Sequence, residues 1–168
     1  MRFAILLVLL GATVAYALGP ARKIDEAGVH RLYRAYSQGM LDEDSAALCR
    51  MYDDKFRGHA SRPAPGGGVE ESLDKAGACE SLPRLLELKR RLSEQIGEEL
   101  YINADYEIRS ITLSPNGKKA TVEVDTELRI GTEQRLVLLL RATETDTVIR
   151  ELGREKFLTS DAVLKTAP

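Results

Sequence analysis

The sequence predicts an α+β domain in which N-terminal helices cover one side of a curved antiparallel sheet of about four strands. Its apolar residues recur with a period of about 3.6 before Gly97 and with a period of two from there to the C-terminus. Helices first and hairpin-linked strands afterwards is the order typical of the α+β class. The 168 residues are 43% hydrophobic and 30% charged, which is typical of one globular domain.

The charge balance argues against nucleic acid as a partner. Lysine and arginine residues number 24, aspartate and glutamate residues 26, and the sequence pI is about 5.8. Binding to a duplex requires a concentrated cationic surface that releases counterions. We therefore expect no nucleic-acid partner.

Residues 1–17 have the features of a signal peptide. Arg2 precedes the apolar run from Phe3 to Leu10, and Ala15 to Ala17 fit the A-x-A pattern of a signal-peptidase site. The apolar stretch is shorter than the roughly 20 residues that a membrane-spanning helix needs. We expect cleavage after Ala17, which leaves residues 18–168 as a single domain that is periplasmic or secreted, without a stable membrane span. Retention of the segment as an anchor is the alternative.

The two cysteines predict a disulfide. Export places the chain in an oxidising space, where Cys49 and Cys79 allow only one pairing. A reactive thiol or a redox pair is the alternative, but a C-x-x-C spacing is missing.

Three helices are predicted before Gly97. The first covers residues 24–38, and its apolar stripe consists of Val29, Leu32, Tyr33 and Tyr36. The second begins near Asp44 or Ser45 and runs to Arg57, with an apolar face made of Leu48, Met51, Tyr52 and Phe56. The third has Ser81 as N-cap and Pro83 in its first turn, and it continues to Ile96.

An exposed loop is predicted between the second and third helices, over residues 61–77. Pro63, Pro65 and the run Gly66 to Gly68 disfavour regular structure. The disulfide would hold the far end of this loop against the second helix. We therefore interpret the loop as a flap over the domain and not as a linker between domains.

The strands follow from alternation of apolar and polar residues. The expected strands cover residues 102–113, 120–130, 136–150 and 155–163. A shift of phase between Ile108 and Ile111 predicts a β-bulge in the first of them. The apolar run from Leu136 to Leu140 predicts a central strand covered on both faces. Helices can cover only one face, so we expect a homodimer through the sheet; a locally buried strand in a monomer is the alternative.

This order of elements resembles the nuclear transport factor 2-like superfamily over about residues 22–163. The resemblance rests on the tyrosine-rich segment VHRLYRAYSQGMLDEDSAAL, on MYDDKF, and on a strand pair with I-x-x-I-x-L, N-G and A-x-V-x-V. It implies a cone in which a strongly bent sheet wraps the helices and leaves a pocket at its open end, commonly with a dimer formed through the sheet. Enzymatic members use pocket side chains that do not map onto this chain residue by residue, so no activity follows from the resemblance.

The candidate pocket residues are four tyrosines and one aspartate. They are Tyr33, Tyr36, Tyr52, Tyr106 and Asp53. The tyrosine hydroxyls would donate hydrogen bonds to a ligand, although core packing explains the same residues. Asp53, beside Tyr52, would be a general base if an apolar pocket raised its pKa; a surface carboxylate is the alternative.

Motifs for cofactor, metal and nucleophile chemistry are missing from the sequence. Gly66 to Gly68 lack the strand and the Gly-Lys-Ser/Thr of a phosphate loop. His30 and His59 belong to no zinc motif, and no G-x-S-x-G is present. We therefore expect no metal, no cofactor and no assigned catalytic residue.

Three functions are compatible with these observations. The first is a non-catalytic exported protein that holds a small apolar ligand in the cone pocket. The second is a protein-binding role in the envelope, such as an immunity-type inhibitor of a toxin or enzyme. The third is a small-molecule isomerase, dehydratase or cyclase that uses Asp53 or a strand carboxylate such as Asp125 as its base.

Overall fold

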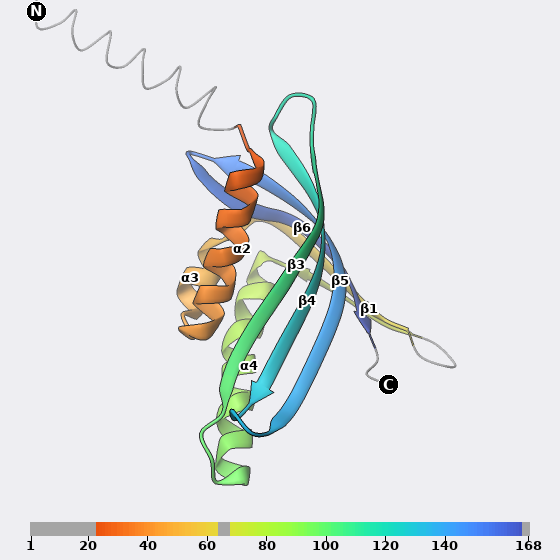
Figure 1. The fold of residues 1–168 in the computed structure, drawn as a ribbon. Helices are drawn as coiled ribbons and strands as arrows, with labels where there is room; N and C mark the ends of the chain where they lie inside the picture. The colour runs from red at the N-terminus through yellow and green to blue at the C-terminus, as the bar shows by residue number, and fades with distance from the viewer. Residues whose placement is uncertain (1–22, 64–67, 166–168) are drawn as a thin grey trace, which may run out of the picture.

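The computed structural model describes residues 23–63 and 68–165, so the predicted signal peptide lies outside the described residues (Figure 1). The helices are α2 (Glu26–Leu41), α3 (Ser45–Arg50) and α4 (Lys75–Ile96). The strands are β1 (Tyr52–Arg62), β2 (Val69–Asp74), β3 (Tyr101–Leu113), β4 (Lys119–Gly131), β5 (Leu136–Glu151) and β6 (Arg154–Lys165). The predicted α+β class is confirmed.

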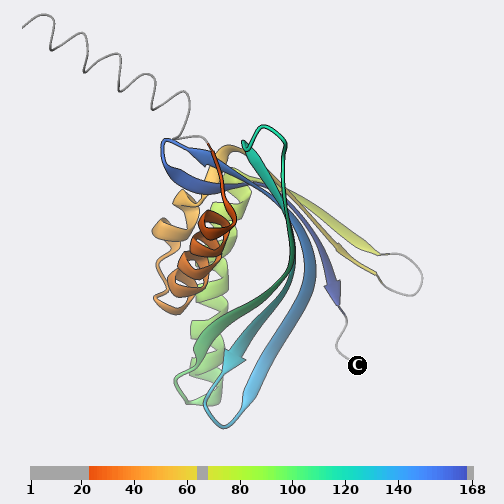
Figure 2. The same ribbon diagram turned by 45° about the horizontal axis from the view of Figure 1, so that its top comes forward.

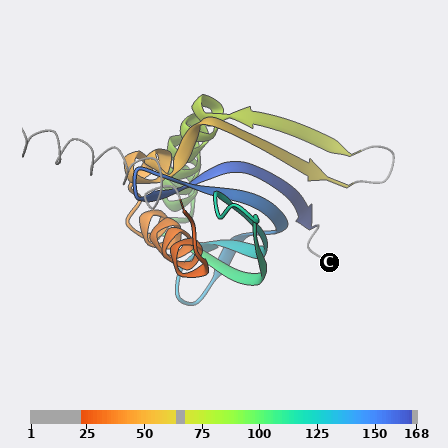
Figure 3. The same cartoon turned by 90° about the horizontal axis from the view of Figure 1, so that it is seen from above.

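The strands form one six-stranded sheet in the order β2-β1-β6-β5-β4-β3. All neighbours are antiparallel except β1 and β6, which run parallel. The sheet is strongly bent, and the helices lie on its concave side (Figures 2 and 3). The expected number of about four strands was therefore too low, because β1 and β2 come from segments predicted as helix and loop.

The second helix was predicted too long. It ends at Arg50, and the chain from Tyr52 onwards forms β1. Tyr52 and Phe56 are four residues apart, a spacing that puts two side chains on one face of a helix and also on one face of a strand. Pairing with β6 makes this segment a strand and not a helix. Where the pairing begins, the Phe157 amide donates to the Met51 carbonyl at 2.8 Å.

The segment predicted as a loop contains β2 and the first turn of α4. Each of the six residues of β2 faces a residue of β1, and together they form a hairpin that projects from the body of the sheet (Figure 3). Helix α4 begins at Lys75 and not at Ser81, because the Asp74 carboxylate caps it by accepting from the Gly77 amide at 2.9 Å. Pro83 consequently lies inside the helix.

The elements predicted from clear periodicity lie close to their expected positions. Helix α2 is capped by Asp25, whose carboxylate accepts from the Gly28 amide at 2.7 Å. Helix α4 ends at Gly97, where a φ of 76° is the left-handed conformation that glycine adopts without strain. Strand β3 contains the predicted bulge, between Ile108 and Ser110.

The hydrophobic core has two clusters. One lies between α2 and the sheet and includes the fully buried Val122, Val124 and Val148. The other joins the three described helices to the far end of β3 and β4 and includes the fully buried Leu100 and Ile130. Tyr36 and Tyr52 contact both clusters, so the interior is continuous along the helices.

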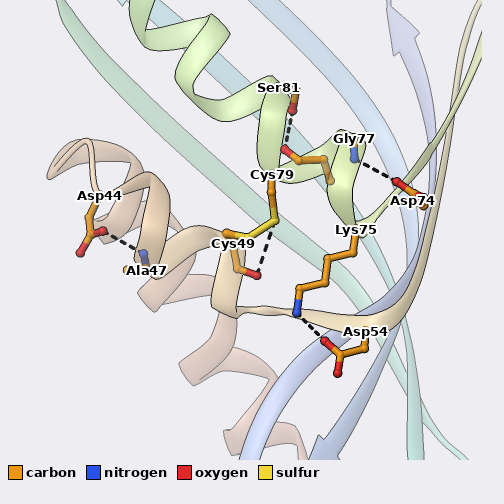
Figure 4. The surroundings of a disulfide bond; sticks show 10 residues. Asp44, Ala47, Cys49, Asp54, Asp74, Lys75, Gly77, Cys79 and Ser81 are labelled. Atoms are coloured by element: carbon orange, nitrogen blue, oxygen red, sulfur yellow. Dashed lines mark hydrogen bonds and ion pairs between the residues drawn. A yellow bond between two sulfur atoms is a disulfide. The ribbon is translucent and has the colours of Figure 1, made fainter.

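The structure contains the predicted disulfide between Cys49 and Cys79, which joins α3 to the first turns of α4 (Figure 4). Two neighbouring contacts hold the same corner. Asp44 caps α3 by accepting from the Ala47 amide at 2.8 Å, and Lys75 pairs with Asp54 of β1 at 2.7 Å. The ion pair thus ties the base of the β1–β2 hairpin to α4, which the disulfide joins to α3.

The apolar run from Leu136 to Leu140 opens β5, which lies between β4 and β6. Its side chains range from half-buried to exposed, and Leu136 is 54% exposed in the single chain. The homodimer stays a prediction. None of the helices in residues 23–63 and 68–165 has the length and apolar character to cross a membrane.

Candidate functional site

A cavity of about 440 Å³ lies between the helices and the concave face of the sheet. Its walls come from α2, α4 and every strand of the sheet, and most of the lining side chains are apolar or aromatic. Its position between the helices and the bent sheet matches the pocket that the family resemblance implied.

The four predicted tyrosines all line this cavity. The Tyr33 ring lies 5.3 Å from that of Tyr106 and meets the Phe157 ring edge-on at 5.4 Å, measured between ring centroids. Burial is the main cause that raises the pKa of the Tyr36 and Tyr52 phenols. The tyrosines are thus both core residues and the wall of the cavity.

Asp53 lies elsewhere. It is buried on β1 and does not line the cavity. Its Oδ1 atom accepts a hydrogen bond from the Lys55 amide at 2.9 Å, which shapes the local backbone.

Four acidic residues that the sequence analysis did not single out border the cavity: Asp105, Glu127, Glu144 and Asp146. Glu144 and Asp146 of β5 are two residues apart and therefore on the same face of the strand. Asp146 is only 2% exposed. Its Oδ2 atom accepts a hydrogen bond from the Tyr33 hydroxyl, whereas its Oδ1 atom is buried without a hydrogen-bond partner in the described part of the chain.

Glu144 is held by two hydroxyl groups. Thr126 of β4 donates to its Oε1 atom, and Ser160 of β6 lies 3.4 Å from its Oε2 atom. Both donors come from strands adjacent to β5, so the carboxylate is fixed on the concave face of the sheet.

The cavity favours the protonated forms of these groups. Burial and then the charge of Glu144 raise the pKa of Asp146 to about 7. Burial also raises the pKa of Glu144, and burial and then Asp146 raise the pKa of Tyr33. A carboxyl group with a pKa near neutrality exchanges its proton readily at physiological pH.

The convex face of the sheet has the opposite character. Asp125 of β4 accepts hydrogen bonds from Thr143 at 2.7 Å, from Lys165 at 3.0 Å and from Arg109 at 2.6 Å. These partners hold the pKa of Asp125 well below its usual range. Asp125 is therefore ionised, on the side of the sheet away from the cavity.

The alternation along β5 was the signal that could have found the acidic pair. Thr143, Thr145 and Thr147 share one face, so the opposite face had to carry Glu144 and Asp146. Within the described ranges, no three His, Cys, Asp or Glu side chains gather as metal ligands would.

Similarity to known proteins exists in structure and not in sequence. No protein-family model matches the chain, and no curated protein sequence does. A ketosteroid isomerase-like protein from Erwinia carotovora atroseptica is 16% identical with a TM-score of 0.55, over 86% of this chain and 100% of the other. A protein of unknown function from Silicibacter pomeroyi, described as similar to nuclear transport factor 2, is 14% identical with a TM-score of 0.53, over 83% and 94%.

This chain has the nuclear transport factor 2-like fold. A putative scytalone dehydratase from Novosphingobium aromaticivorans shares it, with 15% identity, a TM-score of 0.53 and coverage of 83% of both chains. At such low identities the likeness establishes the fold alone, and the activity has to be argued from the side chains of the cavity.

Proposed function

We propose that this nuclear transport factor 2-like protein is an exported binding protein that holds a small, mostly apolar molecule in its cavity. The observation that carries the proposal is the cavity itself, which combines an apolar and aromatic wall with a few converging polar groups. Its volume of about 440 Å³ lies within the range of small-molecule sites, roughly 300 to 1,000 Å³. The disulfide supports export, because such bonds persist in oxidising compartments.

Filling the cavity tests the proposal. Ala104 of β3 lines the cavity, so Ala104→Phe places a ring inside it and should abolish ligand binding. Glu107→Phe adds the same ring to an exposed position of the same strand, on the opposite face, and should leave binding unchanged. Native mass spectrometry of the exported protein would show bound ligand in the wild type and in Glu107→Phe but not in Ala104→Phe. An empty wild-type cavity, without a thermal shift across a metabolite panel, would contradict the proposal and favour the protein-binding alternative.

Proton transfer is the second candidate function, and Asp146 is the observation that favours it. Its pKa near 7, its free Oδ1 atom and its contact with Tyr33 suit a general acid or base of an isomerase, dehydratase or cyclase. Ketosteroid isomerase-like and putative scytalone dehydratase structures share the fold.

Asp146→Asn should then reduce turnover of a substrate by about 100-fold or more, the usual contribution of a positioned acid or base. The wild-type rate should change with pH near the pKa of Asp146. Asp125→Asn, on the other face of the sheet, is the matched control and should keep full activity. Unchanged turnover in Asp146→Asn would remove this residue from the mechanism.

A further inference from the structure

The acidic pair in the cavity lacks a cationic counterpart. Glu144 and Asp146 pair with no lysine or arginine in the described part of the chain, and their protein partners are hydroxyl groups. Arg141 borders the cavity, but its guanidinium donates to Glu127. A buried and a partly buried carboxylate side by side without a cation are costly, because a buried charge is normally paired.

Asp146 also keeps one acceptor free. Its Oδ2 atom accepts from the Tyr33 hydroxyl, but its Oδ1 atom has no hydrogen-bond partner among the described residues. The residue as a whole is only 2% exposed. A buried acceptor without a donor destabilises a protein. A ligand with a hydrogen-bond donor at this point would remove that cost.

Aromatic rings surround the same position. Tyr33, which donates to Asp146, packs against both Tyr106 and Phe157. Tyr36 and Tyr52 pack against Phe157 and continue the wall. The faces of aromatic rings attract cations, most strongly where water is excluded. The cavity is therefore lined by carboxylates and aromatic rings together, which is the chemistry that recognises an ammonium group on an apolar body.

We propose that the ligand is an apolar amine, bound in its protonated form with the ammonium group against Asp146 and Glu144 and its apolar part against the aromatic wall. This assignment rests on the proposed binding function and adds the chemical class of the ligand. An anionic ligand would be repelled by the pair. A neutral alcohol would satisfy the Oδ1 atom but would not offset the repulsion between the two carboxylates.

The groups around Asp146 determine how binding depends on pH. Glu144 on its own strand, Tyr33 and Tyr36 on α2, Tyr52 on β1 and Asp161 on β6 are the titratable groups that interact with it, and Tyr106 on β3 lies against Tyr33. All of them are acids. A bound cation favours ionised Asp146, so amine binding should weaken as pH falls through the pKa of this group, about 7.

Three indole compounds of similar size test the ligand class. Tryptamine carries an ammonium group, tryptophol a hydroxyl and indoleacetate a carboxylate on the same apolar body. Calorimetric titration of the exported protein at about pH 8 should show tryptamine binding about tenfold more tightly than tryptophol and indoleacetate binding not at all. At about pH 5 the advantage of tryptamine should disappear, while tryptophol binding stays constant.

Variants locate the preference in the acidic pair. Asp146→Asn and Glu144→Gln should each bring tryptamine close to tryptophol in affinity, and Asp125→Asn on the convex face should keep the wild-type preference. Two cavity variants are used so that the test still stands if circular dichroism shows that one of them does not fold.

Equal binding of tryptamine and tryptophol would overturn the amine assignment and leave the binding function standing. A preference that survives in both cavity variants would also overturn it. Binding of neither compound contradicts the amine assignment, and the Ala104→Phe comparison then decides separately whether the cavity holds another ligand.

Discussion

Replacing Cys49 and Cys79 by serine is expected to lower the free energy of unfolding by about 3 to 4 kcal/mol. The cysteines are 30 positions apart, and the bond between them restricts a chain segment of that length in the unfolded state. In the folded state the bond ties the six-residue helix α3 to α4. A helix as short as α3 has little stability of its own, so it depends on such contacts.

Denaturant unfolding monitored by circular dichroism measures this difference. The wild type with its disulfide reduced should unfold at the same denaturant concentration as the double serine variant, since both lack the bond. If the reduced wild type and the variant were as stable as the oxidised wild type, the disulfide would have no role in stability. The expected loss is a large part of the roughly 5 to 15 kcal/mol that holds a domain folded.

Helices and strands whose sequence has one unambiguous pattern could be predicted from local periodicity alone. Strand β4 alternates from Ala120 to Ile130, and four of its inward residues are fully buried, as the alternation requires. Strand β1 could not be predicted in the same way, because the spacing of Tyr52 and Phe56 satisfies a helix and a strand equally. Its parallel pairing with β6, about 100 residues later in the chain, decides the outcome.

The cavity was predicted only in part for a related reason. The tyrosines stood out because they are large and mark apolar faces of helices and strands. Asp146 is a single aspartate in a threonine-rich strand, and nothing in its local sequence shows that Tyr33, 113 positions away, donates to it. Its raised pKa arises from burial between elements that only the folded chain brings together.

Asp146 is also expected to make the protein less stable as pH rises from about 4 to about 7. The pKa of this group increases from 3.8 in an ordinary environment to about 7 in the folded protein. Between these values the folded state binds more protons than the unfolded state, so the free energy of unfolding falls with rising pH. The total cost at neutral pH is on the order of 4 kcal/mol for a pKa shift from 3.8 to about 7. It is reduced by any stability that Glu144 regains as the only ionised member of the pair.

Asp146→Asn isolates this effect, because asparagine stays neutral and still accepts a hydrogen bond from Tyr33. Urea unfolding should show the variant to be more stable than the wild type at about pH 8, by up to about 4 kcal/mol, and close to it at about pH 4. Asp125→Asn should instead be less stable than the wild type at both pH values, because the partners that lower the pKa of Asp125 stabilise the folded state throughout this range and lose the effect only in much stronger acid. A constant difference between Asp146→Asn and the wild type at both pH values would mean that Asp146 is not held protonated. A stability gain confined to neutral pH would instead identify Asp146 as a residue kept at the expense of stability, as is expected of a group that serves a ligand.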